Sequence, residues 1–94
     1  MLGPVKLIIL YRPNSEHATP TEAFARDFLH VHSNVARKLE LLSISTRDGA
    51  ATASLYDVTT YPAILALADN GSILNMWQGE PLPLMDEVAA YTVD

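Results

Sequence analysis

The feature that most constrains the fold is the short run at residues 5–11, in which Lys6 is the only charged residue. Pro4 and Pro13 bound this run, and its aliphatic and β-branched residues favour a strand. A strand that is apolar at nearly every position is typical of the centre of a parallel sheet, where both faces are covered. The run therefore predicts an α/β domain with helices packed on both faces of a sheet.

A helical pattern follows this strand. Four apolar residues recur at spacings of four, three and four, and so share one helix face: Phe24, Phe28, Val31 and Val35. Two starts compete for this helix. Ser15 can cap it, with Pro20 bending the first turns, or Thr19 can open a Thr-Pro-Thr-Glu capping box.

The remaining elements alternate in the same way. The sequence predicts strands at residues 39–44, 63–68 and 73–78, a short helix at 50–56 opened by Asp48-Gly49, and a last helix after Gly79 with Pro83 near its start. Four residues are expected to cover the apolar side of that last helix: Leu84, Met85, Val88 and Tyr91. Asn70-Gly71 between two apolar runs predicts a hairpin turn. The order is β-α-β-α-β-β-α, in one domain over residues 1–94.

Composition limits the chemistry. The chain has 94 residues, a formal net charge of −5 and no cysteine, so disulfides, thiolate metal sites and thiol nucleophiles are excluded. The few basic residues are scattered, which argues against a nucleic-acid partner. No apolar run approaches the ~20 residues of a membrane span. We expect a cytoplasmic protein without a cofactor or a metal.

One segment carries a resemblance to a known family. Tyr56 is followed by one residue, Val58, three residues and then Pro62, which leads straight into the strand at 63–68. With Trp77 and Gly79 at the end of the next strand, this order resembles thioredoxin-like proteins, and its layout is closest to the glutaredoxins. The resemblance implies a minimal thioredoxin-like fold, with a four-stranded mixed sheet, helices on both faces and a cis peptide bond before Pro62.

The departure from that family lies after the first strand. Where the glutaredoxins carry Cys-x-x-Cys at the helix start, this chain reads Ser15-Glu16-His17-Ala18. This alignment favours Ser15 as the helix cap. Dithiol exchange requires thiolates, and a serine hydroxyl cannot form a mixed disulfide. Oxidoreductase activity of the family type is therefore excluded.

The resemblance nevertheless suggests where a binding surface lies. In this fold the loop at residues 12–18, the Tyr61-Pro62 loop and the Gly79-Glu80 segment should meet at one end of the sheet. They supply the candidate binding residues Arg12, Ser15, Glu16, His17, Tyr61, Pro62, Gly79 and Glu80. The leading hypothesis is a non-catalytic module that binds a protein or peptide in a cleft beside Tyr61-Pro62, with Tyr11 or Pro13 as a second wall. The structural alternatives are a solvated Arg12 and a Tyr61 ring that packs over its own loop.

Two other functions stay open. Arg12 corresponds to the basic residue that glutaredoxins turn toward a glutathione carboxylate, so glutathione or a similar anion could bind there and at the helix N-terminus. A cysteine-free enzyme could use Ser15 as nucleophile and His17 as base beside Glu16, although the sequence offers no third orienting group. We expect a monomer, with the exposed edge strand at residues 73–78 as the place where a weak dimer would form.

Overall fold

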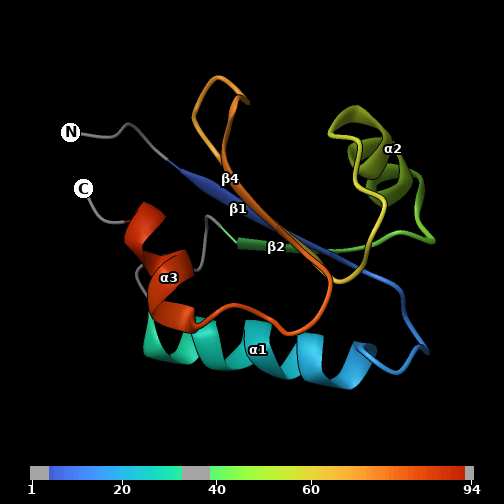
Figure 1. Ribbon diagram of the computed structural model, residues 1–94, viewed down its shortest axis with the longest axis horizontal. Coiled ribbons are helices and arrows are strands. Elements are labelled where there is room, and N and C mark those ends of the chain that lie inside the picture. The colour runs from blue at the N-terminus through green and yellow to red at the C-terminus, as the bar shows by residue number, and fades with distance from the viewer. Residues whose placement is uncertain (1–4, 33–38, 93–94) are drawn as a thin grey trace.

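The structure is a computed structural model that describes residues 5–32 and 39–92 (Figure 1). The elements in chain order are β1 (Lys6–Tyr11), α1 (Ala18–Val31), β2 (Leu39–Ser43), α2 (Arg47–Leu55), β3 (Ala63–Leu67), β4 (Ile73–Gln78), α3 (Met85–Ala89) and the 3-10 turn η2 (Ala90–Thr92). This is the predicted β-α-β-α-β-β-α order. Val35 of the predicted apolar stripe lies outside the described residues.

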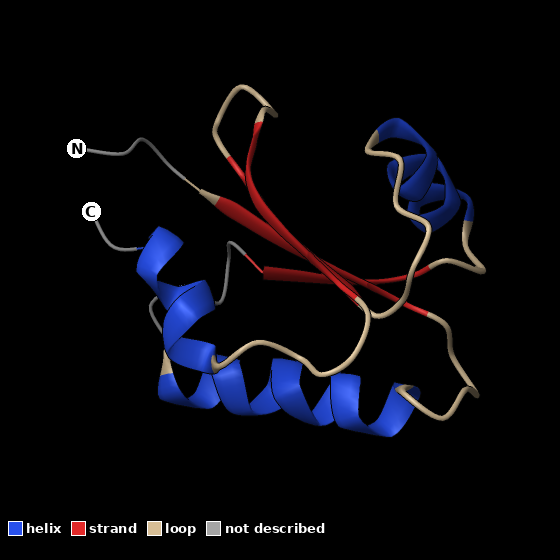
Figure 2. Cartoon of the chain, viewed as in Figure 1, coloured by secondary structure: helices blue, strands red, loops and turns tan. Residues whose placement is uncertain are grey.

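The four strands form one mixed sheet in the order β2-β1-β3-β4 (Figure 2). β1 and β2 run parallel, β3 is antiparallel to β1, and β4 is antiparallel to β3. The hairpin between β3 and β4 forms where Asn70-Gly71 predicted it, and Gly71 alone of this pair has a positive φ, +88°. The register of β1 and β3 places Leu10 opposite Ala63 and Lys6 opposite Leu67.

Helices cover both faces of the sheet, as expected. α1 and α3 lie on one side and α2 on the other (Figure 1). Leu7 and Ile9 face the core beneath α1 and α3, whereas Ile8 and Leu10 face the core that α2 covers. These four side chains are at most 5% exposed, so burial of β1 on both faces is confirmed.

The predicted start of α1 is wrong. The helix begins at Ala18, with His17 at the N-cap position and no side-chain cap. The Ser15 hydroxyl donates to the carbonyl of Arg12 instead of accepting from a helix N–H, because the loop brings that carbonyl into reach. Thr19 does not cap the helix either, since it already lies within the first turn. Pro20 is tolerated there because the first N–H groups of a helix have no intrahelical partner.

The buried face of α1 also differs from the predicted stripe. It consists of Ala18, Thr21, Ala25 and Phe28. Phe24 is half-buried and Val31 is 62% exposed, so Val31 does not belong to the core. The ring of His32 packs against the buried Phe28 at a centroid distance of 4.9 Å, so His32 contacts Phe28 at this end of α1.

The helix α2 begins earlier than predicted. Thr46 caps it, because its Oγ1 accepts the N–H of Gly49 at 3.0 Å. Gly49 therefore lies inside the helix rather than before it. It also packs directly on the end of β2, where an added Cβ would lie 1.9 Å from the carbonyl oxygen of Ser43.

In α3, Val88 is buried and Met85 packs partly against the core, and Tyr91 of η2 does so as well, as expected. Leu84 is 70% exposed, which contradicts its predicted place on the apolar side. The reason is that Leu84 is the N-cap residue with an extended backbone, so its side chain does not follow the face of the helix.

The contact of Gly49 with β2 gives the first prediction. Gly→Ala inside a helix ordinarily stabilises it by about 1 kcal/mol. We expect Gly49→Ala to lower the free energy of unfolding by about 2 kcal/mol instead, because the new methyl group collides with main chain. The control is Ala51→Gly at an exposed position of α2, which should cost about 1 kcal/mol through helix propensity alone. A Gly49→Ala protein as stable to urea as the wild type would contradict this packing.

Candidate functional site

The predicted site lies at the end of the sheet where β1 finishes and β3 begins. β1 ends at Tyr11, and the loop that follows leads into α1. Because β3 is antiparallel to β1, its first residue, Ala63, lies beside Leu10. Pro62 is therefore held next to the end of β1, where it is fully buried. The Tyr61-Pro62 peptide bond is cis, as the resemblance implied.

Arg12 and Tyr61 meet at this end of the sheet. The guanidinium carbon of the exposed Arg12 lies 5.9 Å from the centroid of the Tyr61 ring, within the range of a cation–π contact. Tyr61 is half-buried, packs against the core beneath α2, and donates its hydroxyl to the carbonyl of Val58 at 3.3 Å. The core and Val58 thus hold the ring on one side, and the positive charge of Arg12 lies over its other side.

Tyr11 does not share this contact. Its hydroxyl donates to Glu22 of α1 at 3.0 Å. Desolvation by burial raises the pKa of Tyr11, and the hydrogen bond to the Glu22 carboxylate and its negative charge raise it further. Tyr11 therefore stays a neutral donor to Glu22 of α1. Arg12, and not Tyr11, is the residue that lies over the Tyr61 ring.

Ser15 and His17 hold the main chain of Arg12. The Ser15 hydroxyl donates to the Arg12 carbonyl, and His17 Nε2 accepts the N–H of Arg12 at 3.0 Å. The nucleophile–base hydrogen bond of the enzyme hypothesis is not among the hydrogen bonds of this loop, since both side chains are turned to Arg12. Glu16 is exposed beside them.

The Gly79 segment closes the site from the other side. Gly79 donates its N–H to the carbonyl of Pro62 at 2.8 Å. Its φ of +80° and the Thr60 methyl group, 3.0 Å from where a Cβ would be, both favour glycine here. Glu80 is exposed, and the Glu80-Pro81 bond is a second cis peptide bond, which the sequence had not led us to expect.

Gln78 is the residue that the sequence analysis missed. Its side-chain Oε1 accepts the N–H of Thr59 at 3.1 Å and the N–H of Thr60 at 3.3 Å. The strand pairing explains its reach, because Gln78 lies opposite Ala63, at the exit of the loop. Gln78 and Gly79 together fix residues 59–62 onto the end of the sheet. The sequence could have indicated this contact, because Gln78 and Gly79 end β4, and β4 pairs with β3, the strand that follows the loop.

Neither a metal-binding cluster nor a membrane-spanning helix is present in residues 5–32 and 39–92. Over these residues there is no group of three or more His, Cys, Asp or Glu side chains that could hold a metal ion. Within the same ranges, none of the helices combines the length and the hydropathy needed to cross a bilayer.

Comparison with known proteins identifies the fold. No protein-family model matches the sequence, and no curated protein matches it significantly. The structure is similar to that of StoA from Bacillus subtilis, with a TM-score of 0.69 and 12% identity over 99% of this chain and 85% of that chain. It is also similar to mitochondrial thioredoxin 3 from Saccharomyces cerevisiae, with a TM-score of 0.64 and 10% identity over 96% and 77%.

A third similar structure holds the first two thioredoxin domains of Saccharomyces cerevisiae Eps1p, with a TM-score of 0.71 and 11% identity. The alignment covers 96% of this chain and 34% of that one. At such identities the likeness establishes the fold alone. The chain therefore has a thioredoxin-like fold, without any cysteine to support the redox chemistry of a Cys-x-x-Cys motif.

The Gln78 contacts give the second prediction. Gln78→Ala removes the acceptor of two main-chain donors, which should lower the free energy of unfolding by about 1 kcal/mol. Amide hydrogen exchange at Thr59 and Thr60 should accelerate. Gln78→Glu is the matched control, because its carboxylate keeps an acceptor oxygen at the same reach. Equal exchange rates at both amides in Gln78→Ala and in Gln78→Glu would show that Gln78 does not hold the loop.

Proposed function

We propose that this domain is a non-catalytic binding module that takes an extended peptide or protein segment on the surface formed by Arg12 and Tyr61, beside the buried Pro62. The cation–π contact of Arg12 with Tyr61 is the observation that carries the proposal. An exposed guanidinium over an aromatic ring offers a planar donor group and apolar contact area in one place, and Arg and Tyr are enriched at protein interfaces.

The rigidity of this surface supports the proposal. The loop at residues 59–62 is held by Gln78 and Gly79, and the bonds that hold it use the N–H groups of Thr59 and Thr60 and the carbonyl of Pro62. None of these bonds uses the main chain of Tyr61. A loop that is ordered before binding loses little conformational entropy when a partner docks.

The geometry gives less support to a small anion at the start of α1. The N–H of Ala18 already donates to the carbonyl of Ser15, and Pro20 has no N–H. Thr19 is then the remaining donor among the first three residues of the helix, whereas anion sites at helix N-termini use several N–H groups. Glutathione binding through Arg12 stays the alternative.

We also propose that the domain acts as a monomer in the cytoplasm. β4 is an edge strand, which could pair with a second copy. The side-chain oxygen of Asn75 accepts the N–H of Met76 at 2.7 Å, and Asn75 Nδ2 donates to the Tyr91 hydroxyl at 2.8 Å. A main-chain donor of the edge strand is thereby occupied within the chain.

Peptide binding tests the main proposal. Peptides selected from a random phage-displayed library on the wild-type domain should bind Arg12→Ala roughly fivefold or more weakly, as when a contact residue of an interface is truncated. Arg26→Ala is the matched control, since it removes an exposed arginine from α1. Equal affinity for wild type, Arg12→Ala and Tyr61→Ala would place the peptide elsewhere, and a library without any binder would reject the proposal.

A nuclear magnetic resonance titration separates the two candidate functions. Under the peptide proposal, millimolar glutathione leaves the amide resonances of Arg12, Ser15 and Tyr61 in place. Saturable shifts of all three amides that disappear in Arg12→Ala would favour the alternative.

A further inference from the structure

A concave region lies at the end of the sheet opposite the Arg12–Tyr61 surface. Its volume is about 440 Å³, within the range of small-molecule sites. The start of β1, the end of β3 and the β3–β4 turn line it on one side, and the last turn of α2 lines it on the other. In Figure 1, α2 and the β3–β4 hairpin both project from the side of the sheet opposite α1 and α3. Since β1 runs from Lys6 to Tyr11, this pocket and the Arg12–Tyr61 surface lie at its two ends.

The pocket is predominantly apolar. Ile8 and Leu67 form its base and are 5% and 4% exposed. Leu55, the last residue of α2, also lines the pocket and is 73% exposed. A ligand with an apolar body would cover both the base and this leucine, and burial of such surface is favourable by roughly 25 cal/mol per Å².

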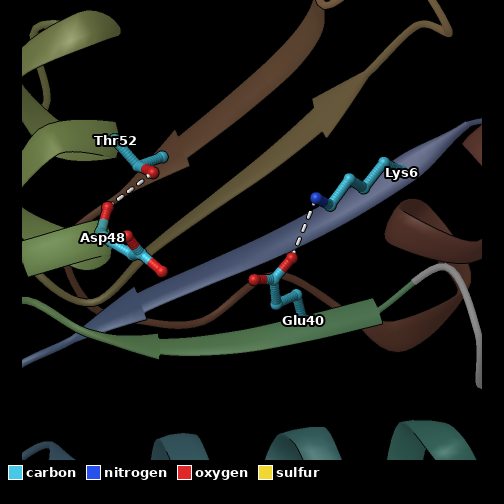
Figure 3. Close-up of polar contacts among 4 residues, drawn as sticks. All are labelled: Lys6, Glu40, Asp48 and Thr52. Carbon is cyan, nitrogen blue, oxygen red and sulfur yellow. Dashed lines mark hydrogen bonds and ion pairs between the residues drawn. The ribbon is translucent and has the colours of Figure 1, made fainter. Parts of the chain in front are cut away.

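The walls of the pocket are held in place without a ligand. The Tyr56 hydroxyl donates to the carbonyl of Gly71 at 2.9 Å, which ties the end of α2 to the hairpin turn. The turn itself is closed by the N–H of Ala68, which donates to Ser72 at 2.8 Å. On α2, the Thr52 hydroxyl donates to the carbonyl of Asp48 at 2.8 Å (Figure 3). The site is therefore preformed rather than created by binding.

The charges at the rim are unequal. Lys6 Nζ lies 2.8 Å from Glu40 Oε1 on the neighbouring strand β2, so this pair is neutral as a whole (Figure 3). Asp69 lines the pocket from the hairpin, is exposed, and forms no ion pair with any other residue in the described ranges. The net charge of the whole chain, −5, has the same sign. An apolar pocket whose rim carries a carboxylate without an ion-pair partner among residues 5–32 and 39–92 complements a cation.

We propose that this pocket binds a small amphipathic cation, with its apolar body on Ile8, Leu67 and Leu55 and its ammonium group on the Asp69 carboxylate. This site is separate from the Arg12–Tyr61 surface and does not depend on the function proposed there.

The probe for this proposal is phenethylamine, compared with hydrocinnamate, which carries a carboxylate on a similar aromatic body. In an NMR titration of the wild-type domain, phenethylamine should shift the amides of Ile8, Leu55 and Leu67 saturably, and hydrocinnamate should bind more weakly. Asp69→Asn should weaken phenethylamine binding by about two- to fivefold, as loss of an exposed ion pair does. Asp27→Asn, an exposed aspartate of α1, is the matched control and should leave the affinity unchanged.

A second pair of variants tests the apolar wall. Leu55→Ala should weaken phenethylamine binding, whereas Leu84→Ala, which removes a leucine of similar exposure near α3, should not. Neither leucine is buried, so both variants should keep the wild-type fold. The proposal is overturned if phenethylamine causes no saturable shifts at these amides, if hydrocinnamate binds equally well, or if Asp69→Asn and Leu55→Ala bind like their controls.

Discussion

Burial of β1 on both faces determines how the other elements are arranged. Its side chains alternate between two cores, so the sheet needs α1 and α3 on one face and α2 on the other. The two neighbours of β1 run in opposite directions, with β2 parallel and β3 antiparallel to it. As a result, the two ends of β1 have different surroundings. One end meets the loop at residues 59–62, and the other meets the hairpin and the last turn of α2.

The absence of cysteine changes what the first of these ends can do. The residues that stand in place of a Cys-x-x-Cys motif support the loop, because Ser15 and His17 both bind the main chain of Arg12. What this loop presents is the guanidinium of Arg12 on the Tyr61 ring. The opposite end presents the carboxylate of Asp69 beside an apolar pocket. The same strand thus separates a surface with a positive group from one with a negative group.

Features that depend on one segment could be predicted from the sequence. These include the buried strand and the hairpin turn, and the resemblance added the mixed four-stranded sheet and the cis bond before Pro62. The start of α1 could not, because Ser15 has the chemistry of a cap and the path of the loop decides which group its hydroxyl meets. The contact of Gln78 with Thr59 joins positions 19 residues apart, and no local pattern marks it. The pocket combines three separate segments of the chain, so only the folded chain reveals it.

The contact between Arg12 and Tyr61 is the central claim, and the chemical shifts of the Arg12 side chain test it most directly. Protons held over an aromatic ring resonate upfield of their usual positions. The wild-type domain should show upfield-shifted Arg12 side-chain resonances with nuclear Overhauser contacts to the Tyr61 ring. Both should vanish in Tyr61→Leu while the remaining spectrum keeps its dispersion. Unshifted Arg12 resonances without contacts to Tyr61 in the folded wild-type domain would contradict the account.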